Sequence, residues 1–382
     1  MSKENVSAFL KKYTMVIVLV IVTLFFTWKT GGRMLLPQNV NNLISQNSYV
    51  FILATGMLLC ILTGGNIDLS VGSVVCFAGA VGATFMVNKG MSVGVSILIM
   101  LVTGLAIGAW QGFWIAYRRI PPFIVTLAGM LIFRGLSNII LNGFTIAPMP
   151  DAYLALFNNY IVDVFHGNGI NITCILAGAV FVLMTFKGRM SKIKKGYKVG
   201  PAVNDIVKCA VISIVIIAFM WRLAQYKGIP MILIWVALIV LIYGYLTSKT
   251  TVGRHLYAIG GNEKAAQLSG INTNKVYFIA YANMGLLAAV AAMAVIARLN
   301  SANPTAGDGY EMDAIGSCFI GGASAYGGSG TIPGVIIGAT LMGVINLGMS
   351  IMGVDANWQK VVKGIVLLAA VIFDVESKKR SK

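Results

Sequence analysis

The stretch SVGVSILIMLVTGLAIGAWQGFWIA, residues 92–116, contains no charged side chain. A helix needs about 20 predominantly apolar residues to cross the hydrocarbon core of a bilayer, so this stretch predicts a transmembrane helix. Its glycines Gly104, Gly108 and Gly112 recur every four residues and therefore share one helix face. Small residues at this spacing let helices pack closely in lipid, where no hydrophobic force joins them. The stretch therefore predicts one span of a tightly packed helical bundle.

The rest of the chain has a similar composition. Of its 382 residues, 58% are hydrophobic and 11% are charged, and the mean hydropathy is +0.83. Soluble domains are about 45–50% apolar and about 25% charged. Apolar surface in this excess requires lipid as its solvent. Because apolar runs recur along the whole length and no small-residue cleavage site follows the first, we expect Lys12–Trp28 to be a retained span and not a signal peptide.

Ten further apolar segments predict spans, which makes eleven in all. They are 13–28, 48–63, 69–87, 122–141, 170–186, 206–223, 230–247, 276–297, 332–351 and 358–374. A second pair of glycines at helix-packing spacing, Gly334 and Gly338, lies in 332–351. The segment 313–330 is ambiguous, because it is rich in Gly, Ala and Ser around a short apolar centre at 315–320.

The distribution of positive charge resolves this ambiguity. Twenty of the 29 Lys and Arg residues gather in five clusters: 3–12, 118–119, 187–208, 249–275 and 378–382. Cytoplasmic loops carry such an excess. A cytoplasmic N-terminus places the first four clusters inside, but eleven spans would leave the last one outside. We therefore expect 313–330 to cross as a broken or partly re-entrant helix, which gives twelve spans and two cytoplasmic termini. The net charge of +17 then reflects topology and anionic lipid headgroups, and no nucleic acid partner is expected.

Enzyme and metal chemistry find little support. The five cysteines lie in apolar runs without a CxxC spacing, and the only histidines are His166 and His255, so no metal site is expected. The stretch 322–327 has the spacing of a phosphate-binding loop, but Gly328 stands where the lysine would be. No GxSxG or HExxH motif is present. We expect no catalytic residues and no cofactor in this chain.

Three charged residues inside predicted spans or directly beside one suggest specific roles, because charges are costly in a bilayer. Asp68 precedes the third span, and both a helix N-cap and a substrate contact are open for it. Arg134 lies in the middle of the fifth span and needs a partner inside the bundle. We expect Lys363, near the start of the last span, to extend toward the outer interface.

Two loops outside the spans are informative. The outer loop 142–169 has a weak amphipathic pattern over 153–161 that is expected to lie along the interface. In the cytoplasmic loop 248–275, Asn262 predicts the N-cap of a two-turn helix, and Gly270 predicts its end. If Ala265 and Ala266 are exposed on that helix, their small side chains would let it fit into a groove on a partner protein. On the residues alone, an ordinary connecting turn is the favoured interpretation.

Three blocks of sequence resemble the permease subunits of bacterial ATP-binding-cassette importers for monosaccharides of the ribose, galactose and xylose type. These are Gly65–Ser73, then Pro122–Met130 with Arg134–Leu136, and finally Gly253–Gly270 continued by Pro304–Ile315, Ile320–Gly322 and Trp358–Gly364. The resemblance covers about 48–143 and 229–375. It implies an all-α integral membrane protein with a ten-helix permease core. The segment 144–228, with two more spans and a basic loop, is an insertion relative to shorter members and looks similar to longer, xylose-type permeases.

The resemblance also implies partners and sites. It implies a second permease copy, ATPase subunits that bind ATP and Mg²⁺, a sugar-binding protein on the outside, and a location in the bacterial cytoplasmic membrane. The residues expected to couple to the ATPase are Gly253, Arg254, Gly260, Gly261, Asn262, Glu263, Ala265, Ala266, Ser269 and Gly270. The residues expected to line the translocation path or gate are Asn66, Asp68, Ser70, Phe123, Thr126, Arg134, Asp313, Gly321 and Gly322.

Two mechanistic questions are open at this point. The glycine-rich stretches 64–68 and 321–334 are candidate hinges or gates, and tight helix packing is the equal alternative. The rival function is a secondary sugar transporter driven by protons or sodium. Against that rival, no inverted repeat is evident, and carboxylates inside the predicted spans are scarce beyond Asp68 and Asp313.

Overall fold

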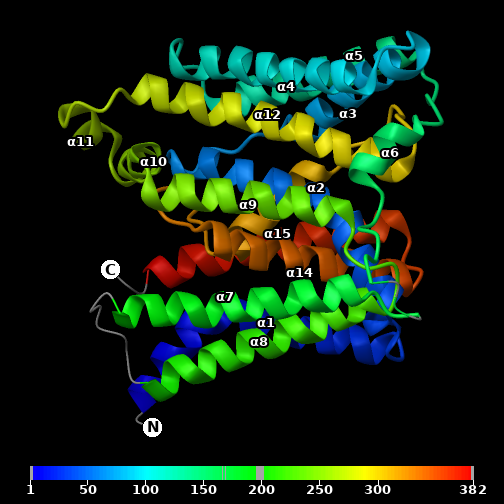
Figure 1. The fold of residues 1–382 in the computed structure, drawn as a ribbon. Coiled ribbons are helices and arrows are strands. Elements are labelled where there is room, and N and C mark those ends of the chain that lie inside the picture. Colours follow the sequence, from blue (N-terminus) through cyan, green and yellow to red (C-terminus); the bar gives the residue numbers. More distant parts are fainter. Residues whose placement is uncertain (1–2, 166, 168, 195–201, 380–382) are drawn as a thin grey trace.

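The computed structural model describes residues 3–165, 167, 169–194 and 202–379, which form a bundle of roughly parallel and antiparallel helices (Figure 1). The longer helices are α1 (Lys3–Lys29), α2 (Pro37–Leu62), α3 (Val71–Ala83), α4 (Val93–Ala116), α5 (Pro122–Leu141), α7 (Ile172–Lys194), α8 (Ala202–Ala224), α9 (Met231–Lys249), α12 (Thr273–Leu299), α14 (Ile332–Ile351) and α15 (Ala356–Lys379). The shorter ones are η1 (Arg33–Leu35), η2 (Thr84–Asn88), α6 (Asp151–Phe157), α10 (Thr251–Gly261), α11 (Glu263–Leu268) and α13 (Tyr310–Ile320).

The helices confirm an all-α integral membrane protein. Seven of those described are long and apolar enough to cross a membrane: α2, α3 with η2, α4, α5, α9, α12 and α14. Shorter apolar stretches lie in α1, α7 and α8. Each of the eleven predicted segments falls largely within a helix. The number of twelve spans and the sides of the termini stay predictions.

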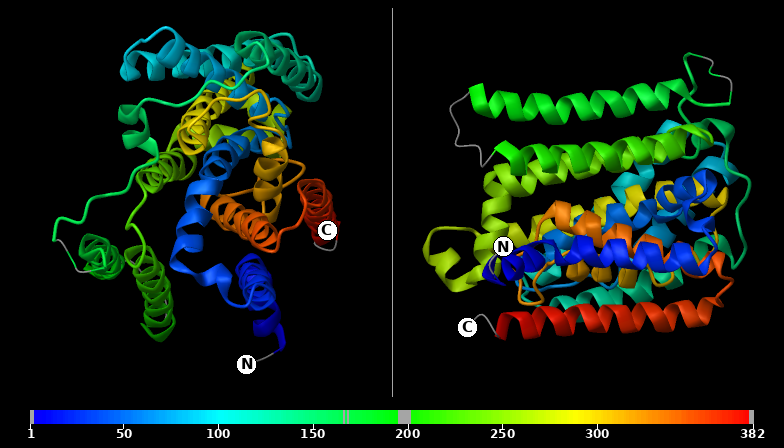
Figure 2. Two further views of the ribbon diagram at one scale, coloured as in Figure 1. Left: turned by 90° about the vertical axis from the view of Figure 1, so that its right-hand side faces the viewer. Right: turned by 90° about the horizontal axis from the view of Figure 1, so that it is seen from below.

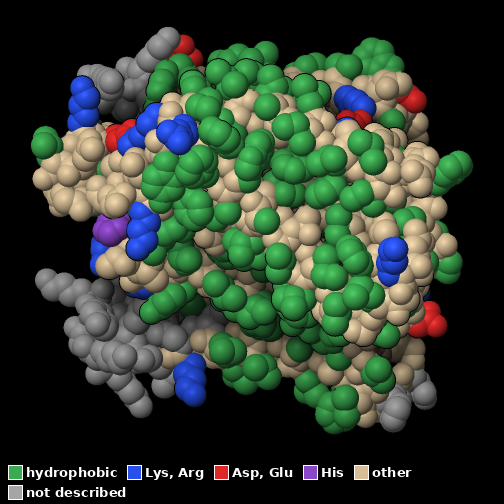
Figure 3. Space-filling model, turned by 90° about the horizontal axis from the view of Figure 1, so that it is seen from above, with side chains coloured by type: hydrophobic (Ala, Val, Ile, Leu, Met, Phe, Trp, Pro, Cys, Tyr) green, Lys and Arg blue, Asp and Glu red, His purple; other side chains and the backbone are tan. Residues whose placement is uncertain are grey.

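Large apolar side chains cover the lateral surface. On α5 and α9, Leu131, Ile139 and Leu241 are each more than 60% exposed. Figure 3 shows the face over α4 and α5, where hydrophobic side chains form a broad band and most charged side chains lie toward its two ends. This is the pattern of a surface that faces lipid in the middle and water at both ends.

The centre of the bundle is built by close helix contacts. A Cβ atom at Gly104 would meet the carbonyl of Gly285, and one at Gly108 would meet the carbonyl of Tyr281, so α4 and α12 approach through their backbones. Gly338 of α14 lies equally close to the carbonyl of Ser317 in α13. The glycine repeats of the two predicted spans are therefore packing surfaces, as expected.

The ambiguous segment is a half-helix followed by irregular chain. Helix α13 has 11 residues, which is about 16 Å and half of a hydrocarbon core of about 30 Å. After it, residues 321–331 contain turns and no helix. Gly328 donates its N–H to the carbonyl of Leu62 (3.1 Å), and Ala325 donates to Asp374 near the end of α15 (3.1 Å). The segment thus has the broken form that was expected, with its irregular half beside the ends of α2 and α15.

Helices α7 and α8 form a hairpin at the edge of the bundle (Figures 1 and 2). The chain leaves and returns at one place, because Ile161 donates its N–H to Ile229 (2.9 Å) and Met231 donates to Asn159 (2.8 Å). In the predicted basic loop 187–198, residues 195–198 lie outside the described residues.

One expectation about loops is wrong, and another stays a prediction. The short helix α6 packs against α12, because Tyr153 is fully buried and its hydroxyl donates to the carbonyl of Met293 (2.8 Å). Its position along a membrane interface stays a prediction. Residues 251–261, expected to be loop, form helix α10, and Thr250 accepts the N–H of Gly253 at its start.

Candidate functional site

Helix α11 is capped as predicted. The side-chain oxygen of Asn262 accepts the N–H of Ala265 (3.0 Å), and Gly270 follows the helix with a φ of +84°. The two alanines differ from the expectation, since Ala265 is exposed but Ala266 is buried against the bundle. The most prominent apolar side chain of the helix is Leu268, which is 90% exposed and was not predicted.

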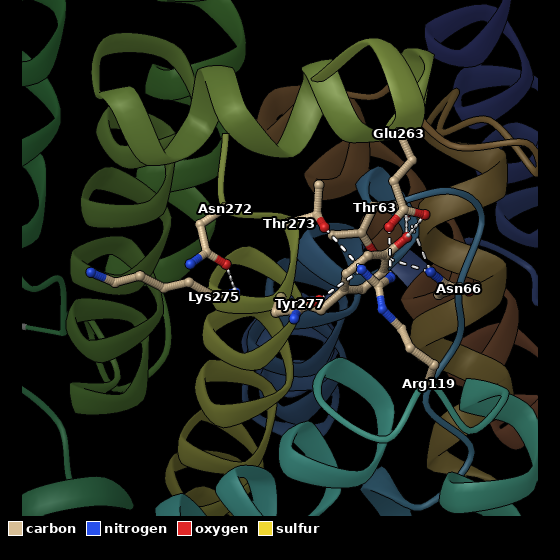
Figure 4. A network of polar contacts seen from close by, with 9 residues as sticks. Thr63, Asn66, Arg119, Glu263, Asn272, Thr273, Lys275 and Tyr277 are labelled. Atoms are coloured by element: carbon tan, nitrogen blue, oxygen red, sulfur yellow. Dashed lines mark hydrogen bonds and ion pairs between the residues drawn. The ribbon is translucent and has the colours of Figure 1, made fainter. Parts of the chain in front are cut away.

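A polar network anchors α11 to its neighbours (Figure 4). Arg119, in the turn between α4 and α5, forms an ion pair with Glu263 (2.6 Å). The same guanidinium donates to Thr273 (2.9 Å) and to Asn274 (2.7 Å) at the start of α12. The guanidinium thus joins the turn between α4 and α5 to α11 and the start of α12, which lie far along the chain from it.

The network continues to the irregular chain between α2 and α3. The Tyr277 hydroxyl lies 2.9 Å from the Thr63 carbonyl and 3.2 Å from Glu263 Oε2. One hydroxyl proton has two acceptors here, so Tyr277 links α11 to the end of α2. Asn66 donates to the carbonyl (3.3 Å) and hydroxyl (3.2 Å) of Thr63. The structure therefore joins one candidate coupling residue, Glu263, to one candidate path residue, Asn66.

Helix α10 makes a second connection to both irregular stretches. A Cβ at Gly260 would meet the carbonyl of Leu62 and the backbone of Gly328, so only glycine allows this approach. Tyr257 donates its hydroxyl to the carbonyl of Gly330 (2.7 Å), and partial burial raises the pKa of this phenol. The glycine-rich stretches thus contact each other and helix α10.

The other candidate coupling residues are distributed over α10 and α11. Gly253 is buried against the carbonyl of Thr247. Ser269 donates its hydroxyl to Ala265 (2.9 Å). Arg254 and Gly261 lie at the exposed surface.

Asp68 is buried and does not cap α3. Its Oδ1 accepts the N–H (2.8 Å) and the hydroxyl (2.6 Å) of Ser70, which precedes the helix. Gln111 of α4 donates to the same Ser70 hydroxyl (2.7 Å). Asp68 is only 2% exposed, so in this conformation it stabilises the turn before α3 and lies away from solvent.

Arg134 has partners that the sequence could not name. Its Nη1 donates to the carbonyls of Pro304 (3.1 Å) and Ala306 (2.7 Å). These carbonyls belong to the loop between α12 and α13. The arginine thus holds the loop between α12 and α13 against α5.

Lys363 does not extend to the interface, contrary to the expectation. It forms an ion pair with Asp313 of α13 (2.9 Å), whose side chain is fully buried. Tyr49 of α2 donates its hydroxyl to the same carboxylate oxygen (2.6 Å). The second oxygen, Asp313 Oδ1, is buried and has no hydrogen-bond partner among the residues that the structure describes. An unpaired charge buried inside the bundle would be costly, so the Asp313 carboxylate is stabilised by its ion pair with Lys363.

The remaining candidate path residues lie at separate places. Phe123 is exposed near the start of α5, and Thr126 is buried one turn later. Gly321 ends α13 and packs against Gly334, while Gly322 lies in the following turn. The predicted path residues thus do not form one cluster. Among the described residues, no group of three or more His, Cys, Asp or Glu side chains could hold a metal ion.

Comparison with known proteins gives consistent matches. Residues 39–371 match the family model described as branched-chain amino acid transport system / permease component. The xylose transport system permease protein XylH of Escherichia coli K12 is 39% identical over 97% of this chain and 93% of its own length. XylH of Haemophilus influenzae is 38% identical over 97% of this chain and 98% of its own. The ribose import permease protein RbsC of Escherichia coli K12 is 35% identical over 88% of this chain and 85% of its own. No solved structure matches.

Proposed function

Since this chain belongs to the family of branched-chain amino acid transport system permease components, we propose that it is the membrane-spanning permease of an ATP-driven monosaccharide importer. The observation that carries the proposal is the similarity to XylH along nearly the whole of both chains. The family description names amino acids, but the similar proteins transport xylose or ribose by name. A pentose is therefore the first substrate to test.

Helix α11 is the proposed docking element for an ATPase subunit, which would bind ATP and Mg²⁺. Its exposed Leu268 offers a small apolar knob. The Glu263, Arg119 and Tyr277 contacts would transmit movement of α11 to Thr63 and Asn66. The candidate coupling residues of α10 act through the Gly260 contact with the second glycine-rich stretch.

The proposed topology has twelve spans in the bacterial cytoplasmic membrane, with both termini and α10–α11 in the cytoplasm. Three features support it: the positive clusters, the seven apolar helices, and the path of α13 and residues 321–331 between the faces. The α7–α8 hairpin is the proposed two-helix insertion. On the outer face, a sugar-binding protein would dock over 142–169 and 298–313.

A second copy of the chain would complete the translocation path. ATP-driven movement would change which side of the path is open, through the irregular stretches 63–70 and 321–331. Non-helical backbone of this kind is tolerated at membrane depth where protein or water covers it. Coupling requires that nucleotide and sugar favour different conformations of these two irregular stretches.

Reconstitution tests the proposal. The chain is placed in liposomes with its ATPase and binding protein, and uptake of labelled D-xylose is followed. Uptake is expected to require ATP on the side of the liposome membrane that carries the ATPase subunits. It is expected to stop when vanadate is added. L-leucine serves as the control solute for the family description. Uptake that survives vanadate and stops when the proton or sodium gradient is collapsed would establish the secondary transporter instead.

A further inference from the structure

A small polar cavity lies between α3, α5 and the start of α13, with a volume of about 170 Å³. It is lined by Ser73, Met130, Leu131, Arg134, Asp308 and Glu311. This is room for several water molecules or one sugar ring.

Two of the polar side chains in this cavity can bind a further group. Ser73 is 2% exposed and lines the cavity, and its hydroxyl can both donate and accept a hydrogen bond. Arg134 uses Nη1 for the loop carbonyls, and a guanidinium has further N–H donors beyond these.

The combination of groups matches the chemistry of a polyhydroxylated ring. The carboxylates of Asp308 and Glu311 accept hydrogen bonds from hydroxyl groups, and the guanidinium of Arg134 donates them. Met130 and Leu131 provide an apolar wall for the C–H face of the ring. Asp308 is already paired with Lys360 (2.8 Å) at the surface, so Glu311 is the carboxylate with more freedom to bind.

The position of the cavity decides what can cover it. Leu131 is 67% exposed on α5. Arg134 is about 18 Å along α5 from Pro122, well inside the predicted span. If lipid tails covered the cavity, an arginine and a glutamate would face hydrocarbon, which is strongly disfavoured. The cavity must therefore face water or another protein.

We propose that this cavity, with Glu311, Arg134 and Ser73 as its polar contacts, is a transient binding site for a monosaccharide in the outer half of the translocation path. This rests on the proposed function, because it places the site on the route of an imported sugar. The site holds the ring briefly after release from a binding protein and before the inner stretches open.

The first test compares sugar uptake with ATP hydrolysis in the same proteoliposomes. Glu311→Gln and Ser73→Ala are expected to lower D-xylose uptake per ATP at least threefold, while hydrolysis stimulated by the loaded binding protein continues. Asp355→Asn, an acid-to-amide change in the outer turn before α15, is the matched control and keeps the wild-type ratio. An unchanged ratio in Glu311→Gln overturns the proposal.

The second test does not depend on ATP. Met130→Cys is treated with a charged, membrane-impermeant methanethiosulfonate, and the parent chain with its five cysteines sets the background. Labelling is expected, and millimolar D-xylose is expected to slow it. Leu98→Cys, on the exposed face of α4, stays unlabelled in lipid. If Met130→Cys is as inert as Leu98→Cys, or if xylose never protects it, the site is refuted. A wild type without ATP-dependent uptake but with sugar-protected labelling would refute the ATP-driven function and keep the site.

Discussion

At the scale of single residues, the buried pair of Asp313 and Lys363 joins α13 to α15. Removing one member of such a pair leaves an uncompensated charge and costs about 3–5 kcal/mol. Lys363→Met is therefore expected to lower the unfolding temperature of the detergent-solubilised protein markedly. The double change Lys363→Met with Asp313→Asn should recover most of the loss, because no unpaired charge remains. Equal destabilisation by the single and double changes would contradict a charge-based role.

Tyr277 tests the link between α11 and the chain before α3. Tyr277→Phe keeps the ring but removes the hydroxyl that reaches Thr63 and Glu263. A hydrogen bond contributes about 0.5–1.5 kcal/mol, so transport is expected to fall about fivefold. Copurification of the ATPase subunit is expected to stay normal, since α11 keeps its cap. Tyr245→Phe, at an exposed position on α9, is the matched control. Normal uptake by Tyr277→Phe would show that the hydroxyl transmits nothing.

At the scale of elements, α11 owes its proposed docking role to one exposed side chain. Leu268→Ser is expected to reduce copurification of the ATPase subunit in mild detergent, because the apolar knob is lost. Gln267→Ser, an exposed position on the same helix, is expected to change little. The measurement is the ratio of the two subunits after affinity purification. Equal subunit ratios for the two variants would show that Leu268 is not part of the docking surface.

Helix α7 begins at a carboxylate contributed from the loop before it. Asp163 accepts the N–H groups of Gly167 (2.9 Å), Ile172 (3.2 Å) and Thr173 (3.1 Å), and the Thr173 hydroxyl (2.8 Å). Desolvation opposes ionisation, but these donors outweigh it and hold the pKa of Asp163 well below its usual range. Negative charge also suits a helix N-terminus.

A depressed pKa in the folded protein has a defined pH dependence. The stabilisation by Asp163 is fully present above the pKa of an unfolded aspartate, about 3.9, and is lost only as pH falls further toward the folded value. Asp163→Ala is expected to speed hydrogen exchange at the Thr173 amide, with the same difference from wild type at pH 7 and pH 5. Asp151→Ala, in the first turn of α6, should leave this amide unchanged. A difference that disappears already at pH 5 would contradict the depressed pKa.

Local features of the elements could be predicted from the sequence, and pairings between distant elements could not. Apolar runs predicted the spans, and Asn262 predicted the start of α11, because both signals lie within a few residues. The partners of Arg119 and Lys363 come from segments far along the chain, and no local pattern identifies them. Ala266 was expected to be exposed because two small residues in a short helix do not show which faces the bundle. Helix α10 was missed because its residues are mixed in polarity and it ends in two glycines.

At the scale of the whole molecule, the α7–α8 hairpin leaves and rejoins the bundle where Ile161 pairs with Ile229. Replacing 164–226 by a short Gly-Ser linker is therefore expected to leave a chain that still inserts. Two crossings are lost together, so tags on the two termini should remain on the same side of the membrane. Tag accessibility in inverted and right-side-out vesicles measures this.

The control for that deletion removes a single crossing. Replacing 172–201 takes out α7 alone and is expected to place the two tags on opposite sides. If the hairpin deletion also separated the tags, the hairpin would not be a pair of spans. If both deletions were degraded, replacing only the exposed apolar positions of α7 by serine would test its insertion by the same assay.

If a second copy covers the proposed cavity, the charges of Arg134 and Glu311 also bear on how the protein is made. A newly inserted copy would then leave the cavity uncovered until its partner arrives. A solitary copy would be a good substrate for the proteases that survey the membrane, and pairing would end its exposure. Cellular abundance would rise more steeply than synthesis rate, because encounter between copies competes with degradation.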